Sequence, residues 1–198
     1  MPLPDALSRA LESDAAPGLR PLPPGVAELL RSLDAPPRLA AHLRAVHDVA
    51  WQLTDRVREH WPTLAFDREA VLFGAATHDM GKTAHPAELS GPGSDHEEAG
   101  RALLLERGFP AELARFAGTH ATWTGPGVTA EDLLVSTADK VWKDKRVPEL
   151  EDLLVGRLSE ATGRPPWEEY LALDTLLERI GEGAGPRLAF QAAFPVRP

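Results

Sequence analysis

The spacing of hydrophobic and polar positions along the chain predicts helices from end to end. Hydrophobic residues recur three and four positions apart, which is the period of a helix with one buried face. No segment shows the alternation expected of a half-buried strand, and no repeat at solenoid spacing is visible. The sequence predicts helices at 5–13, 25–33, 36–61, 68–79, 95–108, 111–121, 130–145, 148–161 and 167–180. We therefore expect an all-α fold.

Start signals mark several of these helices. Thr129 is followed three positions later by Asp132, and Ser94 by Glu97, so both pairs fit a capping box. Asp34 is a plausible N-cap for the helix predicted at 36–61. Stretches rich in glycine and proline, "SGPGS" and "WTGPG", separate neighbouring helices.

Length and proline content predict the domain organisation. A chain of 198 residues, 43% of them hydrophobic, suits one globular domain. Eight of the 19 prolines fall within the first 37 residues, which favours extended chain with short helices there. We expect a proline-rich lead-in at 1–37 and a packed helical core at 38–198.

Composition and charge limit the partners. The chain has no cysteine, so disulfides and thiolate metal sites are excluded and any metal must bind to imidazole and carboxylate groups. The net charge of -9 gives no general attraction to nucleic acid or to an anionic membrane. Neither a basic apolar leader nor an apolar run of membrane-spanning length is present. We expect a soluble, cytoplasmic protein with no membrane partner and no extended nucleic-acid binding.

Several ionisable residues occupy positions that should face the core. At 100° per residue, His42 lies about 50° from the centre of the hydrophobic stripe of its helix, and His47 about 80° to 90° away on the other side. His78 and Asp79 end a helix with almost no polar side, and the remaining candidates have hydrophobic residues at their helical-neighbour positions. The inward set is His42, His78, Asp79, His96, His120 and Asp139.

This set predicts a metal centre. Burial of one such group without a partner costs several kcal/mol, so converging groups need a shared compensating charge. Any one of these histidines alone can be read as a hydrogen-bonded core residue, but six inward groups on five helices favour a metal. We interpret His47, His60 and His85 as ordinary histidines, although His85 follows Lys82 closely enough to border a pocket.

The order of these residues resembles the HD-domain metal-dependent phosphohydrolase superfamily over roughly residues 38–146. The resemblance includes "THDMGK" around the His-Asp pair and "STADKVWKDKR" around the last aspartate. "HLRAVHDVA" resembles the family's His-x-x-x-Val-x-x-x-Ala pattern, which favours His42 over His47 as the first ligand. Members with two further histidines between the pair and the last aspartate resemble binuclear enzymes, and this chain has both. A downstream Gly-Tyr-Pro feature, associated with cyclic-dinucleotide phosphodiesterases, is absent.

The resemblance implies an all-α helical bundle that holds two divalent transition-metal ions. Asp79 would bridge the ions, His42, His78 and Asp139 would bind one, and His96 and His120 the other. Iron, manganese, cobalt, nickel and zinc all suit such ligands. A bridge is reasonable because neighbouring side chains on a helix project 100° apart, so the helix end must lie between two metal positions.

The implied activity is cleavage of a phosphoester by metal-activated water, on a monoester or diester of a small, nucleotide-like phosphorylated substrate. Lys82 would be catalytic by stabilising negative charge on the phosphate, although a solvated lysine at a helix end also explains it. Lys140 and Lys143 can meet a phosphate at the cleft rim or form part of a solvated helix face. Trp123 can stack on a base or pack against the core. Two alternatives stay open: a mixed-valent di-iron oxygenase on the same fold, and a non-catalytic nucleotide-binding sensor.

Overall fold

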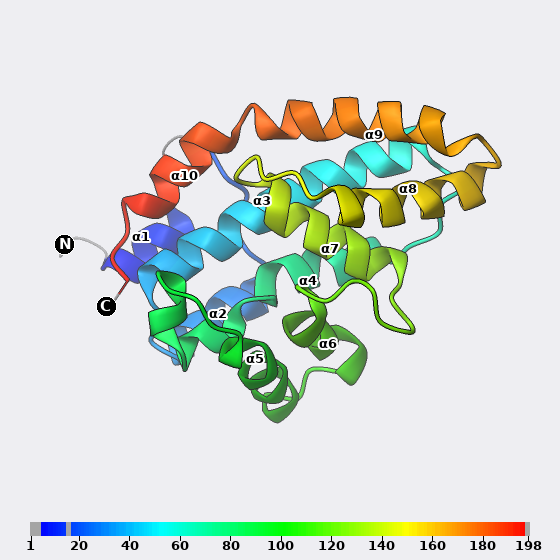
Figure 1. Ribbon diagram of the computed structural model, residues 1–198. Helices are drawn as coiled ribbons and strands as arrows, with labels where there is room; N and C mark the ends of the chain where they lie inside the picture. Colours follow the sequence, from blue (N-terminus) through cyan, green and yellow to red (C-terminus); the bar gives the residue numbers. More distant parts are fainter. Residues whose placement is uncertain (1–4, 15–16, 197–198) are drawn as a thin grey trace.

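The computed structural model describes residues 5–14 and 17–196, so residues 1–4 and 15–16 of the expected lead-in lie outside the described residues. Within these ranges the chain forms α-helices and two short 3₁₀ helices, with no strand, which confirms the all-α fold (Figure 1). In chain order they are α1 (Ala6–Glu12), α2 (Pro24–Ser32), α3 (Pro37–His60), α4 (Arg68–Thr77), η1 (Met80–Thr83), η2 (Pro86–Leu89), α5 (Asp95–Glu106), α6 (Ala111–Thr119), α7 (Ala130–Val141), α8 (Pro148–Thr162), α9 (Pro166–Gly181) and α10 (Ala184–Ala192).

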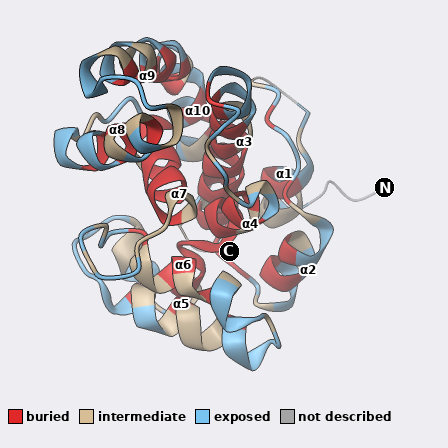
Figure 2. Ribbon diagram, turned by 90° about the vertical axis from the view of Figure 1, so that its right-hand side faces the viewer, coloured by how far each residue is buried: buried red, intermediate tan, exposed pale blue. Residues whose placement is uncertain are grey.

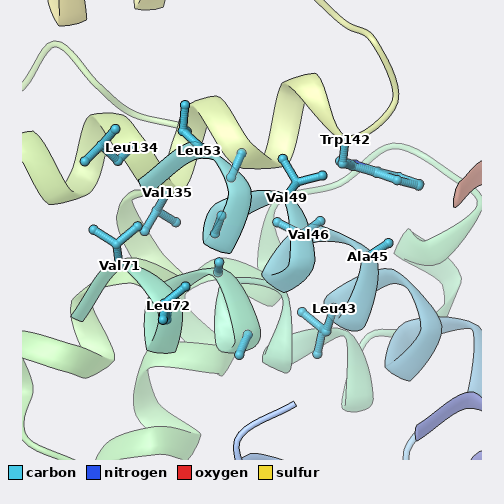
Figure 3. Packing of buried hydrophobic residues seen from close by; sticks show 14 of the residues in the cluster. Leu43, Ala45, Val46, Val49, Leu53, Val71, Leu72, Leu134, Val135 and Trp142 are labelled. Atoms are coloured by element: carbon cyan, nitrogen blue, oxygen red, sulfur yellow. The ribbon is translucent and has the colours of Figure 1, made fainter. Parts of the chain in front are cut away.

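Helix α3 is the central element of the fold. It packs against α4 and α7, and also against α1, α9 and α10. The pair α5 and α6 lies on the opposite side of α3 from α8 and α9 (Figures 1 and 2). Hydrophobic residues of α3, α4 and α7 meet in the core of the protein (Figure 3). They include Val46 and Val49 of α3, Val71 of α4, and Leu134 and Val135 of α7. None of the described helices is long and apolar enough to cross a membrane.

The lead-in shares this core. The short helices expected there are present as α1 and α2, and α1 packs on α3. Arg44 of α3 is buried and donates hydrogen bonds to the carbonyl oxygens of Ala10, Leu19 and Arg20. The described part of the lead-in also adds eight buried hydrophobic residues: Ala10, Leu11, Leu19, Leu22, Val26, Leu29, Leu30 and Ala35. The division at residue 37 stays a prediction, but the hydrophobic core continues across it.

Of the three predicted N-caps, Asp34 is wrong, Ser94 is confirmed in position only, and Thr129 is confirmed with its capping box. Helix α3 begins at Pro37 with Pro36 as its N-cap, whereas Asp34 has a φ of 47° and lies outside the helix. Ser94 is the N-cap residue of α5, as predicted, but its side chain makes no capping hydrogen bond, so the expected capping box is absent. Thr129 and Asp132 form both bonds of the capping box that begins α7.

One helix end and one whole helix also differ from expectation. Helix α7 stops at Val141 rather than continuing to residue 145, because the chain turns there and Asp144 has a φ of 58°. Helix α10 was not predicted at all. Its buried Arg187 donates hydrogen bonds to the carbonyl oxygens of Trp142 and Ile180, which ties the C-terminal helix to the ends of α7 and α9.

A contact between backbones joins η1 to α5. A Cβ atom on Gly81 would overlap the carbonyl oxygen of His96, and a Cβ atom on Gly100 would lie 2.8 Å from the backbone nitrogen of Gly81. Both positions therefore require the absence of a side chain. This crossing sets the segment after the His-Asp pair directly against the helix that carries His96.

Candidate metal centre

Five α-helices and the 3₁₀ helix η1 bring the inward residues together. His42 comes from α3, and Asp139 from the last turn of α7. His78 is the C-cap of α4, and Asp79 follows it as the N-cap of η1. The remaining two are His96 in the first turn of α5 and His120 at the C-cap of α6. All six are buried, with at most 7% of any residue exposed.

One group consists of His42, His78 and Asp139. The Nε2 atoms of His42 and His78 lie 3.2 Å apart. Asp139 Oδ1 lies 3.3 Å from Nε2 of His78 and 3.8 Å from Nε2 of His42. Three potential ligand atoms thus surround one small volume, with all pairs within 4.8 Å.

Asp79 joins this group to a second one. Its Oδ1 lies 3.1 Å from Nε2 of His96 and 3.6 Å from Nε2 of His120. Its Oδ2 lies 3.1 Å from Nε2 of His42 and 3.7 Å from Nε2 of His78. One carboxylate therefore presents an oxygen to each pair of histidines.

The unpaired atoms of the cluster fit a bound cation. Asp79 Oδ1 and His96 Nε2 are buried and have no hydrogen-bond partner among the described residues, although they face each other. Buried polar atoms are normally hydrogen-bonded, so unpaired ones that face each other across one small volume are suited to share a ligand. Neutral imidazole and carboxylate groups are suitable donors for a divalent transition metal.

The far side of two imidazole rings, those of His78 and His120, is held so that Nε2 points into the cluster. Nδ1 of His78 is 2.9 Å from the carbonyl oxygen of Ala75, and Nδ1 of His120 is 3.2 Å from that of Ala117. Such bonds place the proton on Nδ1 and leave the Nε2 lone pair free for a metal. His42 differs, because its Nδ1 has no partner within the described part of the chain. Its ring packs instead against Trp142, with the centroids 5.0 Å apart.

Burial and mutual contact set the charges of the cluster. Burial lowers the pKa of His120 to about 4 and also lowers the pKa of His42, so both rings are neutral at pH 7. Burial opposes ionisation of Asp79 and Asp139, but the neighbouring groups together outweigh it and lower both carboxyl pKa values: the histidines around Asp79, and His78 with Lys140 beside Asp139. The same carboxylates raise the pKa of His78 against the effect of burial. The centre therefore keeps two negative charges at its middle.

Two lysines flank these carboxylates. Lys82 Nζ lies 2.7 Å from Asp79 Oδ2, and Lys140 Nζ lies 2.6 Å from Asp139 Oδ2. Both side chains are less than one-fifth exposed. Trp123 packs partly against the core, and Lys140 Nζ lies 6.0 Å from the centre of its ring. A cationic and aromatic edge thus borders the cluster.

The rest of the basic run points to other partners. Lys143 is exposed, with its Nζ 5.8 Å from the ring centre of Trp142. Arg146 forms ion pairs with Glu151 and Asp174, at 2.6 and 2.7 Å, so its charge is used within the fold. Substrate contact by Lys143 stays a prediction.

The other three histidines lie apart from the cluster. His47 is buried, and burial lowers its pKa to about 4. His60 is exposed, with Nδ1 3.0 Å from the carbonyl oxygen of Arg56. His85 is half-buried and lies near Glu88 and Asp95.

Sequence reasoning missed Glu88. Its carboxylate lies against Nδ1 of His96, on the side of the ring that faces away from the cluster. Glu88 belongs to a short 3₁₀ helix in a glycine- and proline-rich stretch, where no periodic pattern indicates which side chains face inward. Glu88 is also eight positions from His96 in the chain, so no helical spacing predicts a contact between the two.

Comparison with known proteins gives one match. The family model of the HD domain matches residues 39–143, which is more than half of the chain and includes all six residues of the cluster. No curated protein and no solved structure matches the chain.

Proposed function

We propose, because the chain belongs to the HD-domain family, that it is a phosphohydrolase that cleaves a phosphoester of a small, nucleotide-like substrate. The family consists mostly of metal-dependent phosphohydrolases, and its members bind divalent metals. The residues matched here include a His/Asp cluster that can hold such metals. The number of ions, two, and the choice of phosphoester are our proposal.

The single observation that supports two ions is the position of Asp79. Its two oxygens face different pairs of histidines, at 3.1 Å from His96 on one side and 3.1 Å from His42 on the other. Asp139 would complete the first position beside His42 and His78. When bound, a pair of metals supplies Lewis acidity and an activated water for attack on phosphorus.

The lysines provide the charge that a phosphate requires. Lys82 and Lys140 each place an ammonium group beside a carboxylate of the cluster. A phosphoryl group that enters this edge would accept charge-assisted hydrogen bonds from both side chains. Lys82 would then stabilise the negative charge that develops on the phosphoryl oxygens during the reaction. These two cations favour phosphate chemistry over the oxygenase alternative.

Trp123 is the residue that we expect to contact a base. It is half-buried beside Lys140, so a ring stacked on it would place an attached phosphate near that lysine. The same residue packs against the core, and the proposal gives it both roles. The cytoplasmic location expected from the sequence stays a prediction.

A phosphoester panel under anoxic conditions tests the function. The full chain, purified without chelators, is loaded separately with iron, manganese, cobalt, nickel or zinc and incubated with nucleoside monophosphates, cyclic nucleotides and dinucleoside polyphosphates. We expect release of phosphate or a nucleotide product in at least one pairing, and none from Asp79→Ala. Turnover that requires oxygen would indicate the oxygenase, and nucleotide binding without turnover would indicate the sensor.

A further inference from the structure

We propose that Glu88 is a positioning residue that orients His96 toward the second metal position. The inference rests on the metal centre of the proposed function but does not depend on its reaction. Glu88 comes from η2, outside the helices that carry the six inward residues. It contacts His96 alone among those six.

One carboxylate makes three contacts at the start of α5. Oε2 of Glu88 lies 2.5 Å from Nδ1 of His96 and accepts a 3.3 Å hydrogen bond from its backbone N–H. Oε1 accepts a 3.2 Å bond from the backbone N–H of Asp95. The Glu88 side chain is only 10% exposed. The ring of His96 and the helix that carries it are therefore held by the same group.

The need for this carboxylate follows from where His96 sits on its helix. His78 and His120 lie at the C-terminal ends of α4 and α6, where each ring reaches the carbonyl oxygen three residues earlier. His96 lies in the first turn of α5, where the residue three positions earlier is outside the helix and the free backbone groups are N–H donors. An imidazole N–H cannot bond to those donors, so its acceptor must come from another segment.

The bond selects the useful form of the ring. A proton on Nδ1, donated to Glu88, leaves the Nε2 lone pair directed at the cluster, where Asp79 Oδ1 is 3.1 Å away. An ionised acceptor makes a stronger bond than a carbonyl oxygen and increases the basicity of the coordinating nitrogen. His96 would thus be held more firmly than its partner His120, whose Nδ1 lies 3.2 Å from a carbonyl.

The preceding loop makes room for the carboxylate. Gly93 has a φ of 151°, and a Cβ atom there would overlap the carboxylate of Glu88. A side chain at this position would be strained and would displace Glu88 from His96. The loop therefore favours the contact between Glu88 and the start of α5. The side chain of Ser94, the expected cap, makes no capping hydrogen bond there.

Zinc binding by variants of the full chain tests the proposal without using activity. Zinc content and affinity are measured by mass spectrometry and by competition with a chelator. Wild-type protein should bind two ions. Glu88→Ala should weaken the second ion by about ten- to a hundredfold and leave the first unchanged, with a smaller effect for Glu88→Gln, which keeps an acceptor. Glu98→Ala is the matched control, because Glu98 is an exposed glutamate on α5.

A second variant separates orientation of the ring from capping of the helix. Ser94→Asp, added to Glu88→Ala, should recover thermal stability by capping α5 but should not recover affinity for the second zinc ion. Long-range ¹H–¹⁵N spectra of the zinc-loaded protein should show the proton of His96 on Nδ1 in the wild type, with its hydrogen-bonded signal lost in Glu88→Ala.

Any of four results would overturn the proposal. Three concern the variants: wild-type affinity for both ions in Glu88→Ala, equal weakening of both ions, or recovery of the second ion by Ser94→Asp. The fourth is binding of a single ion by the wild type. Selective loss of the second ion in a protein that hydrolyses no phosphoester would support the role of Glu88 and reject the proposed reaction. If Glu88→Ala does not fold, the comparison of Glu88→Gln with Glu98→Gln decides.

Discussion

Lys82 Nζ lies 2.7 Å from the same Asp79 oxygen that faces His42, so the lysine and the first metal position share one carboxylate oxygen. Asp79 and Lys82 nevertheless have different proposed partners. Asp79 would bind the metal ions, and Lys82 would bind the phosphate of the substrate.

Replacement of each residue should therefore have a different effect. Asp79→Ala should remove both ions and the activity, since both positions depend on its oxygens. Lys82→Ala should retain the ions and lower kcat by roughly thirty- to a thousandfold, the cost of a lost charge-assisted contact in a transition state. Metal analysis and product-release kinetics measure the two effects, with the exposed Lys145→Ala as control. Two ions in Asp79→Ala, or unchanged kinetics in Lys82→Ala, would contradict the assigned role.

His42 and His47 lie on the same helix and are both buried, yet they should differ in metal binding. Nε2 of His42 faces the cluster, whereas the ring of His47 packs near Trp51, with the centroids 6.4 Å apart. We expect His42→Ala to weaken the first metal ion by at least about tenfold, as loss of a ligand should exceed loss of a supporting contact. His47→Ala should leave the affinity unchanged and lower only stability. Equal metal affinities for the two variants would reject the choice of His42.

The lowered pKa of the buried His47 should make the stability of the protein depend on pH. Burial lowers its pKa from 6.5 to about 4, so the unfolded chain takes up a proton at a pH where the folded protein does not. The free energy of unfolding should therefore fall as the pH falls, by roughly 1.5 kcal/mol between pH 6.5 and 5. His47→Gln should lack this contribution and lose less stability over the same interval. Urea unfolding of both proteins, each freed of metal, gives the difference, and parallel curves would show that His47 contributes nothing.

Removal of metal should destabilise the fold. The cluster joins α3, α4, α5, α6 and α7, and a metal that binds only the folded state stabilises it by mass action. At metal concentrations a hundredfold above Kd, each position contributes about 3 kcal/mol. Calorimetry with and without EDTA should show Tm lower by about 10 °C or more after chelation. Asp79→Ala should show no such change, and an equal change in that variant would mean that the chelator acts elsewhere.

The fold and the cluster were predictable to the extent that helical periodicity reports burial. His96 and His120 were expected to face inward because of their hydrophobic neighbours at helical spacing, and the structure places both rings beside Asp79. Helical periodicity cannot indicate which side chains are buried in a segment that has no periodic pattern. Glu88 therefore went unnoticed between η1 and α5, and Ser94 was assigned a capping role that the distant carboxylate performs.

Long-range contacts of the main chain escaped prediction for a similar reason. Arg44 reads as a polar residue on a helix, but its partners are carbonyl oxygens of the lead-in, 24 to 34 positions away. Arg187 likewise bonds to carbonyl oxygens at the ends of other helices, which no hydrophobic pattern marks.

The crossing of Gly81 and Gly100 affects how this centre could be transferred to another protein. A designer who copied the histidines and aspartates onto a new bundle would leave out two residues with no functional group. Without them, the segment after the His-Asp pair could not approach α5 closely, and His96 would be displaced from Asp79. The smallest portable unit of the centre therefore includes both glycines, because here the absence of a side chain fixes a distance between ligands.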